Sequence, residues 1–227
     1  MDVARISYAE AAPFIQRWHY SGKMPKGRCV AFGGSGDDGL YAVAVYGNGA
    51  NPYQAQSLRR LTGLPIHDSN LYCLTRLART EPRADPPLSY FLARCHKQLR
   101  HEGIRFIVSF SDPDEGHVGG IYKASNFIHL GKTQSEWHTV DVHGVRVHRR
   151  RAYRYARTHG CDISVARERL GLRRVKTSPR DRWFLPICKG DRSRMYREPS
   201  LESELDRVIG RLRRRLSGIG RVESGKL

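Results

Sequence analysis

The stretch from residue 85 to residue 112, DPPLSYFLARCHKQLRHEGIRFIVSFSD, predicts a helix followed by a buried strand. Its first part places apolar side chains on one helical face, at Leu88, Phe91, Leu92, Cys95 and Leu99. Pro86 suits the first turn of a helix, and Gly103 suits its end. The run from 104 to 110 is mostly apolar, as in a strand that is covered on both faces. We therefore expect an α/β fold around this unit.

The residues before this unit predict further strands of the same sheet. Apolar runs at 29–32 and 40–46 flank a glycine-rich turn, which predicts a β-hairpin. A β-rich run at 71–77 precedes the helix and predicts another strand. The sequence also predicts a first helix from residue 7 to residue 18, which begins with capping-box spacing. An antiparallel hairpin before a strand–helix–strand crossover predicts a mixed sheet flanked by helices.

The remaining residues continue this alternation. We expect a short helix at 118–125, a strand that begins within 126–130, a β-pair at 137–147, a last strand at 182–186 and a basic amphipathic helix at 201–216. A length of 227 residues suits one domain with an appendage. We therefore expect one domain at 1–190 and a basic helical tail at 191–227.

The charge of the chain is large and unevenly distributed. Lys and Arg number 40 against 22 Asp and Glu, which excludes an ordinary neutral domain and favours a polyanionic partner such as DNA. Residues 146–227 hold 24 basic and nine acidic side chains. Arginine suits phosphate because its planar fork can donate two hydrogen bonds. The DNA-binding candidates are Arg146, Arg149, Arg150, Arg151 and Arg154; a solvated basic surface is the alternative interpretation.

Cysteine usage and hydropathy point to a reducing compartment. The five cysteines are scattered, and no two of them form a C-x-x-C pair, so neither a zinc knuckle nor a disulfide framework is indicated. No apolar run approaches the ~20 residues of a membrane span, and we expect no membrane partner. The first residues lack the layout of a signal peptide. We therefore expect a cytoplasmic protein, and the sequence leaves its oligomeric state open.

Five short motifs carry a resemblance to a known family. They are WHYSG at 18–22, AVYG at 44–47, LTRLA at 74–78, VSFSDP at 108–113 and GHVGGIYKASNF at 116–127. The element order resembles the acyltransferase fold of the GCN5-related N-acetyltransferases. The motifs resemble, more specifically, the phage Mu Mom family of DNA-modification proteins. The resemblance covers about residues 5–135 well and about 136–190 loosely, and it makes the 1–190 region an acyltransferase-like catalytic domain.

This resemblance implies a transferase that converts adenine N6 in DNA to its carbamoylmethyl (acetamido) form. Such a change protects phage DNA from host restriction, and it implies the cytoplasm of a phage-infected or prophage-carrying bacterium. Acetyltransferases of this fold hold the coenzyme A pyrophosphate on a glycine-containing loop before the central helix. Here the segment 79–87 has no glycine and three prolines, which lack N–H donors. We therefore expect a glycine-derived donor, or one carried on an RNA such as tRNA, rather than acetyl-CoA.

The catalytic candidates follow from the same motifs. They are His19, Tyr20, Ser111, Asp112 and Tyr122. Adenine N6 is a poor nucleophile, so the enzyme must orient it, take its proton and polarise the donor. We expect His19 to act as a base or metal ligand and Tyr20 and Tyr122 as proton donors. Asp112 would orient the amine, and capping of a helix is the structural alternative for it. Ser111 would hydrogen-bond the substrate.

Substrate-binding candidates surround these residues in the sequence. They are Arg76, Ser109, His117, Gly119 and Asn126. Arg76 lies in a predicted strand that is otherwise apolar. If its side chain is buried, it needs a partner, and that partner would be the substrate or Asp112. Tyr122 and Asn126 are four residues apart, which predicts one helix face, and Asn126 would read an adenine edge. Backbone N–H groups near Gly119 would bind an anion or a carbonyl.

Three alternatives stay open from the sequence. A metal ion could bind His19, Tyr20 and Asp112, although no H-x-x-x-H or H-E-x-x-H motif occurs. The chain could be a coenzyme A-dependent N-acyltransferase that acts on another substrate. It could also be a nucleic-acid-binding protein without catalysis. Aromatic side chains at the predicted site would suit an extruded base, because an enzyme that modifies adenine N6 in duplex DNA must flip the base out.

Overall fold

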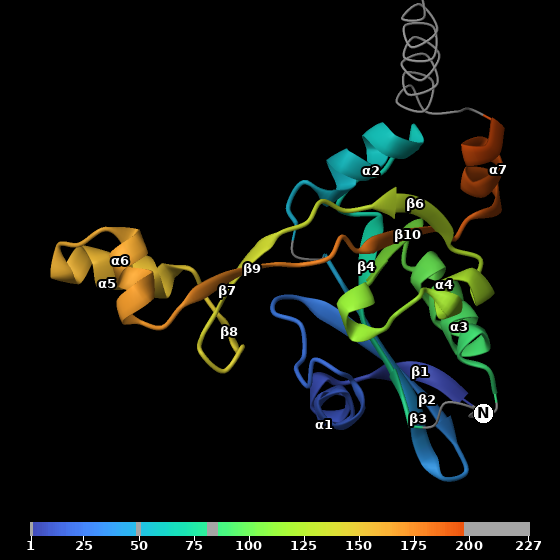
Figure 1. The fold of residues 1–227 in the computed structure, drawn as a ribbon. Coiled ribbons are helices and arrows are strands. Elements are labelled where there is room, and N and C mark those ends of the chain that lie inside the picture. The colour runs from blue at the N-terminus through green and yellow to red at the C-terminus, as the bar shows by residue number, and fades with distance from the viewer. Residues whose placement is uncertain (1, 49–50, 81–85, 198–227) are drawn as a thin grey trace, which may run out of the picture. The chain divides into compact units, whose positions relative to one another are not determined.

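The computed structural model describes residues 2–48, 51–80 and 86–197 of the 227-residue chain. The chain divides into two compact units (Figure 1). The first unit comprises Met1–Ser109, Ile121–Leu130 and Trp183–Leu227. The second unit comprises Phe110–Gly120 and Gly131–Arg182. The predicted boundary at residue 190 stays a prediction, because most of the tail lies outside the described residues.

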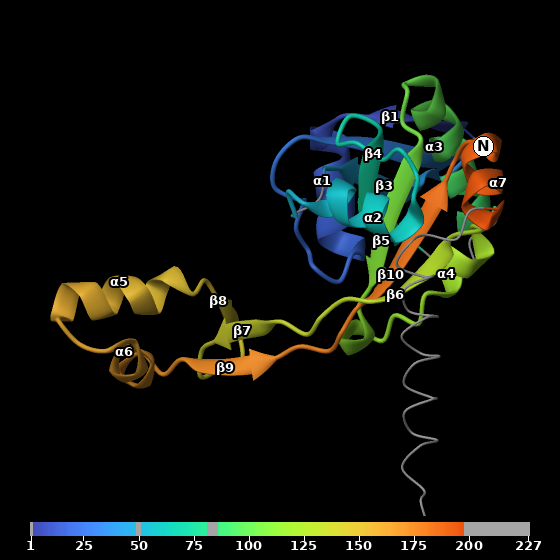
Figure 2. The same cartoon turned by 90° about the horizontal axis from the view of Figure 1, so that it is seen from above.

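A mixed seven-stranded sheet organises the fold, in the order β1-β2-β3-β4-β5-β10-β6. Its strands are β1 (Asp2–Ile6), β2 (Cys29–Gly36), β3 (Gly39–Gly47), β4 (Leu71–Arg79), β5 (Phe106–Ser111), β10 (Asp181–Pro186) and β6 (Ile128–Lys132). Neighbours from β1 to β4 pair antiparallel, whereas β4 and β5 pair parallel. The helices that accompany this sheet are α1 (Tyr8–Trp18), α2 (Gln54–Thr62), α3 (Leu88–His101), α4 (Gly120–Ala124) and α7 (Lys189–Arg197) (Figures 1 and 2).

Two helices cover opposite faces of the sheet because side chains alternate along β3. Val43 and Val45 are fully buried in a cluster with Ile15 of α1. Ala44 and Tyr46, one residue out of phase, are buried in the cluster that includes Phe91 of α3. The β3 strand is therefore covered on both sides, which explains its continuous apolar run.

The predicted start of α1 is confirmed. Ser7 Oγ accepts a hydrogen bond from the Glu10 backbone N–H at 3.2 Å, and Glu10 Oε2 accepts one from the Ser7 N–H at 2.7 Å. These reciprocal bonds satisfy two N–H groups that the first helical turn would otherwise leave unpaired. The capping also lowers the pKa of Glu10, because both hydrogen bonds from Ser7 favour the carboxylate. Pro13 is accommodated within the helix.

The crossover that the sequence predicts is also confirmed. Between the parallel strands β4 and β5, α3 buries the predicted apolar face together with one residue that the prediction did not include, His96. The helix begins at Leu88 after Pro87, which makes no side-chain cap. The expected position of Pro86 in the first turn is therefore wrong, because Pro86 lies two residues before the helix, and the expected cap Asp85 lies outside the described residues. The helix ends before Gly103, whose φ of +85° is the left-handed conformation that glycine favours.

The second unit holds a small antiparallel sheet in the order β8-β7-β9. Its elements are β7 (Trp137–Val140), β8 (Arg146–Val147), β9 (Arg173–Lys176), α5 (Arg150–His159), α6 (Ile163–Arg169) and the 3-10 helix η1 (Pro113–Glu115). The β7–β8 pair confirms the predicted β-pair around the turn at His143 and Gly144. Ala152 and Ala166 are the buried residues of α5 and α6.

The structure confirms the α/β class and the mixed sheet flanked by helices. It adds β1, α2, β9 and α7, which the sequence pattern did not predict. The short helix α4 begins at Gly120, two residues later than expected. The basic helix predicted at 201–216 lies outside the described residues. Within the described ranges, no helix has the length and apolar character of a transmembrane span.

Candidate functional site

Two hydroxyl groups meet where the pairing of the parallel strands ends in the first unit. The register between β4 and β5 runs from Leu71↔Phe106 to Cys73↔Val108. Immediately after it, Ser109 Oγ lies 2.9 Å from the Leu74 carbonyl oxygen and 2.8 Å from the Tyr122 hydroxyl. The single hydroxyl proton of Ser109 can be donated to only one of these oxygens. When Leu74 accepts it, the Tyr122 hydroxyl donates to Ser109, so the pair can pass on a proton.

The surroundings of Tyr122 suit a proton donor. Its ring stacks on the Trp183 indole with centroids 5.6 Å apart, and it meets the Phe127 ring edge-on at 5.3 Å. Burial raises the pKa of Tyr122 to about 12, although its hydrogen bond with Ser109 acts in the opposite direction. At neutral pH the phenol therefore keeps its proton, as an ordinary tyrosine also does. The predicted role of Tyr122 as a proton donor stays a prediction.

His19 and Tyr20 follow α1. The Ser21 backbone N–H donates to His19 Nδ1 at 3.1 Å, so Nδ1 accepts and the proton of the neutral ring lies on Nε2. The His19 and Tyr20 rings are 4.3 Å apart, and 56% of Tyr20 is exposed. After burial, the charge of an ionised Tyr20 is among the causes that raise the pKa of Tyr122. In this tautomer His19 presents a donor at Nε2, and a role as base requires the other tautomer.

Arg76 has backbone partners. Its Nε donates to the Lys23 carbonyl at 2.8 Å, and a terminal nitrogen donates to the Thr75 carbonyl at 2.7 Å. The sequence predicted that Arg76 needs a partner if it is buried, and these two carbonyl groups are partners of its guanidinium. Arg76 thereby ties β4 to the loop that follows His19 and Tyr20. Its predicted contact with substrate stays a prediction.

Asp112, in the second unit, makes two structural interactions. Its Oδ2 accepts from Arg180 Nε at 2.7 Å, and its Oδ1 accepts from the Asp114 backbone N–H at 3.2 Å, which caps η1. The capping alternative for Asp112 is therefore confirmed, and it does not exclude a catalytic role. Asp114 in turn accepts from the Ser178 backbone N–H at 3.1 Å. The hydrogen bonds from Ser178 lower the pKa of Asp114, so this carboxylate stays ionised.

The other candidates from the turn after β5 lie in the same unit. The Ser111 side chain is buried. The His117 backbone N–H donates to the Asp112 carbonyl at 3.2 Å, which closes the turn around η1. Gly119 has a φ of +76°, the left-handed conformation, and directly precedes α4. The backbone conformation before α4 therefore explains why glycine occurs at this position. Anion binding by the neighbouring N–H groups stays a prediction.

The predicted placement of Asn126 on one helix face with Tyr122 is wrong. Helix α4 ends at Ala124, and Asn126 adopts a φ of +60° beyond it. Asparagine tolerates this left-handed conformation because its short polar side chain can bond locally. The chain reverses there, and the Phe127 N–H donates to the Tyr122 carbonyl at 2.9 Å. The four-residue spacing failed because the helix is only five residues long.

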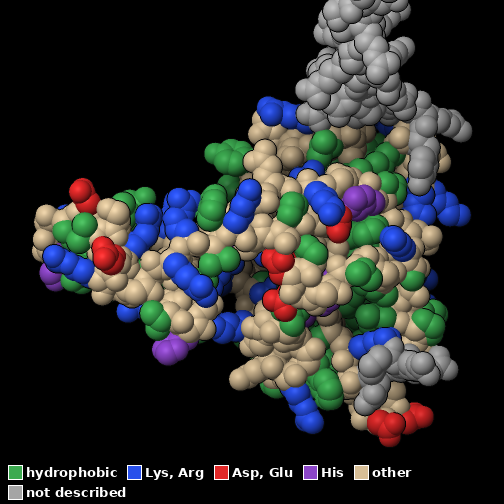
Figure 3. Space-filling view, in the orientation of Figure 1, with side chains coloured by type: hydrophobic (Ala, Val, Ile, Leu, Met, Phe, Trp, Pro, Cys, Tyr) green, Lys and Arg blue, Asp and Glu red, His purple; other side chains and the backbone are tan. Residues whose placement is uncertain are grey.

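The second unit carries an exposed basic surface. All five DNA-binding candidates are exposed, and four of them are on α5 or at its start. In the part of the chain that the structure describes, none of the five lies within ion-pairing distance of a carboxylate. Figure 3 shows Lys and Arg side chains across this unit. Trp137 is 56% exposed, and the Arg174 guanidinium lies 4.9 Å from its ring centroid. Unpaired arginines beside exposed aromatic rings are typical of nucleic-acid surfaces.

Sequence reasoning missed three residues that the structure brings to the candidates. Trp183 stacks on Tyr122, His129 lies against Trp183 at 4.9 Å, and Arg180 pairs with Asp112. All three partners are distant in sequence from the residues that they contact, so no local spacing indicates them. A buried-type strand containing a tryptophan, at 182–186, was the one available signal. No cluster of three metal-ligating side chains occurs among the described residues.

Several solved structures resemble the chain, each at low sequence identity. The chain resembles an aminoglycoside 6'-acetyltransferase type Ii (11% identity, TM-score 0.45, 83% of this chain and 98% of that one). It also resembles the ribosomal-protein-S18-alanine N-acetyltransferase of Escherichia coli (10%, 0.43, 82% and 93%). A third similar structure is an N-acyl amino acid synthase from uncultured soil microbes (12%, 0.45, 86% and 99%).

Comparison of the sequence itself gives one assignment. No curated protein sequence matches the chain. The profile of the Mom protein family, by contrast, matches residues 1–201, which is most of the chain and includes every candidate described above. The chain therefore belongs to the Mom protein family.

Proposed function

We propose that this protein is a DNA-modifying transferase that converts adenine N6 to N6-carbamoylmethyladenine. Its membership of the Mom protein family, over residues 1–201, is the observation that carries this proposal. The biological consequence would be protection of phage DNA from host restriction. The Ser109–Tyr122 pair and the basic surface of the second unit support the proposal, because the reaction needs a proton donor and a contact with DNA.

The reaction requires one bond to form and one to break. The exocyclic amine of adenine attacks the methylene carbon of an acetamide-bearing donor, which forms the new N–C bond. The bond between that carbon and the leaving group breaks, and the leaving group takes the electron pair. N6 then loses a proton. A proton donor beside the leaving group lowers the barrier, because it neutralises charge as that charge develops.

Tyr122 is the residue that we assign to the leaving group. Its raised pKa keeps the phenol protonated at neutral pH, and Ser109 Oγ at 2.8 Å can receive or return a proton. His19 is assigned to accepting the N6 proton and Tyr20 to donating a proton. Ser111 and Asp112 are assigned to holding and orienting the adenine. Arg76, Ser109, His117, Gly119 and Asn126 are assigned to substrate binding. Every one of these assignments is part of the proposal.

We assign DNA binding to the second unit. Arg146, Arg149, Arg150, Arg151 and Arg154 are exposed, which leaves their guanidinium groups available to phosphate oxygens. Exposed Trp137 offers a ring on which an unpaired base can stack. An extruded adenine needs both kinds of contact, since phosphate clamps hold the strand while an aromatic ring takes the place of the neighbouring bases.

We propose a chemical class for the donor rather than a particular molecule. A glycine-derived acetamide group, free or carried on an RNA, would supply both carbons and the amide nitrogen of the product. The segment 79–87, with three prolines and no glycine, lacks the backbone donors that hold a coenzyme A pyrophosphate. If the donor is carried on RNA, the phosphate groups of that RNA would also bind basic side chains on the surface of the protein.

Nucleoside mass spectrometry tests the proposal. Wild-type protein and Tyr122→Phe are expressed in a bacterial host, and the digested DNA is searched for an adenosine that is one carbamoylmethyl unit heavier. We expect the modified nucleoside with wild type and its near-complete loss with Tyr122→Phe. Acetylated adenine instead would indicate a coenzyme A-dependent acyltransferase. The DNA could also stay unmodified after phage-infected extract is added to protein that is folded and bound to DNA. The remaining interpretation would then be a nucleic-acid-binding protein without catalysis.

A further inference from the structure

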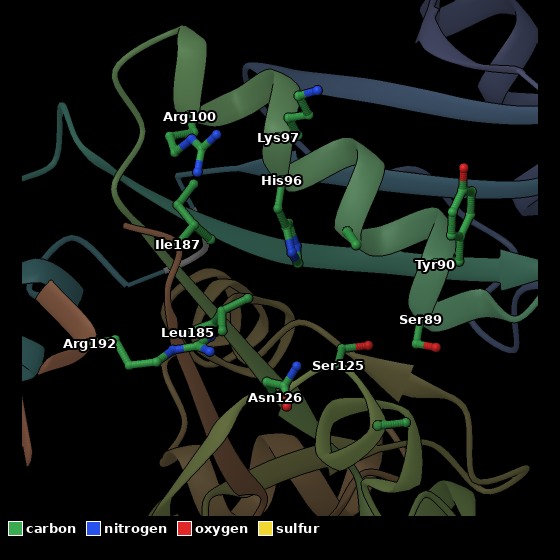
Figure 4. Close-up of a pocket in the computed structure, with 12 residues that line it drawn as sticks. Ser89, Tyr90, His96, Lys97, Arg100, Ser125, Asn126, Leu185, Ile187 and Arg192 are labelled. Atoms are coloured by element: carbon green, nitrogen blue, oxygen red, sulfur yellow. The ribbon is translucent and has the colours of Figure 1, made fainter. Parts of the chain in front are cut away.

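A cavity of about 530 Å³ in the first unit is separate from the Ser109–Tyr122 pair. It lies between α3, the end of α4 and the residues that follow β10, and we refer to it as the α3 cavity (Figure 4). Of the candidate site residues described above, Asn126 alone is among its described lining residues. Its volume is within the range of small-molecule sites, which is about 300–1,000 Å³.

Two polar atoms in the wall of the α3 cavity are buried without a partner. His96 is 7% exposed, and within the described residues neither His96 Nε2 nor Ser125 Oγ makes a hydrogen bond. Figure 4 shows the His96 ring extending from α3 toward Ser125 and Asn126. A buried polar atom without a partner costs stability, because water no longer solvates it. A ligand that hydrogen-bonds to both atoms would remove this cost.

The ring of His96 is neutral in this setting. It packs edge-on against Tyr46 and Phe127, at centroid distances of 5.9 Å in both cases. Burial lowers the pKa of His96 to about 3. An uncharged imidazole beside the cavity favours a neutral polar ligand group over an anionic one.

Two arginine side chains of the α3 cavity lie at one end. Arg100 and Arg192 lie at the same side of the close-up, and Tyr90 and Ser89 lie at the other (Figure 4). None of the described lining residues is acidic, and Lys97 adds a third positive charge. Arg192 is held near this end because its neighbour Asp191 is buried and accepts from Arg105 Nε at 3.0 Å. An anion with several oxygens suits two guanidinium forks.

The opposite end suits a flat apolar group. Tyr90 is 47% exposed, and its ring offers a surface on which a planar group can stack. Leu185 and Ile187 add apolar wall to the cavity. The α3 cavity thus has a cationic end, a neutral polar middle and an aromatic end. A purine or pyrimidine joined through ribose to a phosphate has the same order of groups.

We propose that the α3 cavity binds a nucleoside monophosphate, with its phosphate at Arg100 and Arg192 and its base between His96, Ser125 and Tyr90. The nucleotide site would not include the Ser109–Tyr122 pair, because neither residue lines the cavity. Helix α3 would contact both the bound nucleotide and the core of the first unit, because it lines the cavity and packs against the sheet. This binding does not depend on the proposed DNA modification.

Isothermal titration calorimetry with AMP tests this proposal on the full chain. Inorganic phosphate and adenosine are titrated separately, and we expect each to bind at least tenfold more weakly than AMP, because each makes only part of the contacts. Arg100→Gln should weaken AMP binding about tenfold, since it removes a charge-assisted bond. Arg94→Gln is the matched control, because Arg94 is exposed on the same helix and does not line the cavity.

His96→Phe separates a ligand site from simple packing. The phenyl ring keeps most of the shape and removes the unpartnered Nε2, so we expect thermal stability to hold or rise while AMP binding falls. Absence of AMP binding at millimolar concentration overturns the proposal. It is equally overturned if Arg100→Gln binds AMP as well as wild type, or if phosphate alone matches AMP. Stoichiometric displacement of AMP by coenzyme A would place the cavity in a coenzyme A site and would also overturn it.

Discussion

Arg180 and Asp112 form a hydrogen-bonded ion pair, with Arg180 Nε 2.7 Å from Asp112 Oδ2, although 68 residues separate them in sequence. The pair links the turn after β5 to the residue directly before β10. Two further bonds hold Arg180 beside the residue after β6, because Arg180 and Thr133 exchange hydrogen bonds at 2.8 and 3.0 Å. The Arg180 side chain is 43% exposed, so the pair contributes modestly to stability. It fixes the orientation of the Asp112 carboxylate, whose charge is what our proposal uses.

Substitution of Asp112 distinguishes its capping role from its charge. Asp112→Asn keeps an oxygen that can accept from the Asp114 N–H, so we expect η1 and the melting temperature to change little. We expect DNA modification to fall at least tenfold, because the amide carries no charge. Asp112→Ala removes both interactions and should abolish modification while DNA affinity is largely kept. Nucleoside mass spectrometry and thermal melting provide the readouts, and near-wild-type product from Asp112→Asn would remove the carboxylate from the mechanism.

Replacement of Tyr122 by Phe removes the proposed proton donor and keeps its packing on Trp183. We expect the rate of modification to fall on the order of 10²- to 10⁴-fold, the usual contribution of a general acid. Stability should fall by only about 1 kcal/mol, because Ser109 still donates to Leu74. Tyr8→Phe, at a tyrosine that is 61% exposed, is the control. Equal rates for the two variants would exclude Tyr122 as the acid.

The pH dependence of the rate follows from the same residue. A proton donor is active below its pKa, and burial raises the pKa of Tyr122 to about 12. We therefore expect no loss of rate from ionisation of this tyrosine up to about pH 11, whereas an ordinary tyrosine ionises near pH 10. A rate profile from pH 7 to pH 11 checks this. A decline centred on pH 10 that Tyr122→Phe abolishes would contradict it.

Three exposed arginines at the start of α5 test the nucleic-acid surface. Replacing Arg149, Arg150 and Arg151 with Ala should weaken DNA binding and reduce the slope of log K against log salt by roughly 0.9 for each phosphate that the variant no longer neutralises. Arg59→Ala, Arg60→Ala and Arg94→Ala together remove equal charge from exposed positions of α2 and α3. Fluorescence anisotropy at several salt concentrations gives both slopes. Equal slopes for the two triple variants would place the DNA elsewhere.

Acid stability depends on His96. Burial lowers its folded-state pKa to about 3, below the unfolded value near 6.5. Between these values the unfolded chain binds the proton and the folded protein does not, so stability falls as pH drops from about 6.5 toward 3. At pH 5 the loss is on the order of 2 kcal/mol. His96→Phe should remove this part of the pH dependence in urea unfolding at pH 7 and pH 5. An unchanged pH dependence would show that His96 does not cause it.

Local patterns were sufficient for most elements of the fold. The Ser7–Glu10 capping box and the apolar face of α3 each act within a few residues, so the sequence predicts the elements that depend on them. The run at 104–110 predicted β5 for a similar reason, because a strand covered on both faces needs apolar residues throughout. Strand β9 was missed because all four of its residues are exposed and three of them are basic, which gives no alternation to detect.

The candidate site divides in the same way. The sequence by itself determined the family motifs, the basic character of the 146–227 region and the individual chemistry of Tyr122, Ser109 and Asp112. Only the tertiary structure decided that Tyr122 lies 2.8 Å from Ser109 and stacks on Trp183, that Arg180 holds Asp112, and that His96 lines a cavity. The reason is that periodicity reports which face of an element is buried, whereas contacts between elements depend on how strands and helices pack.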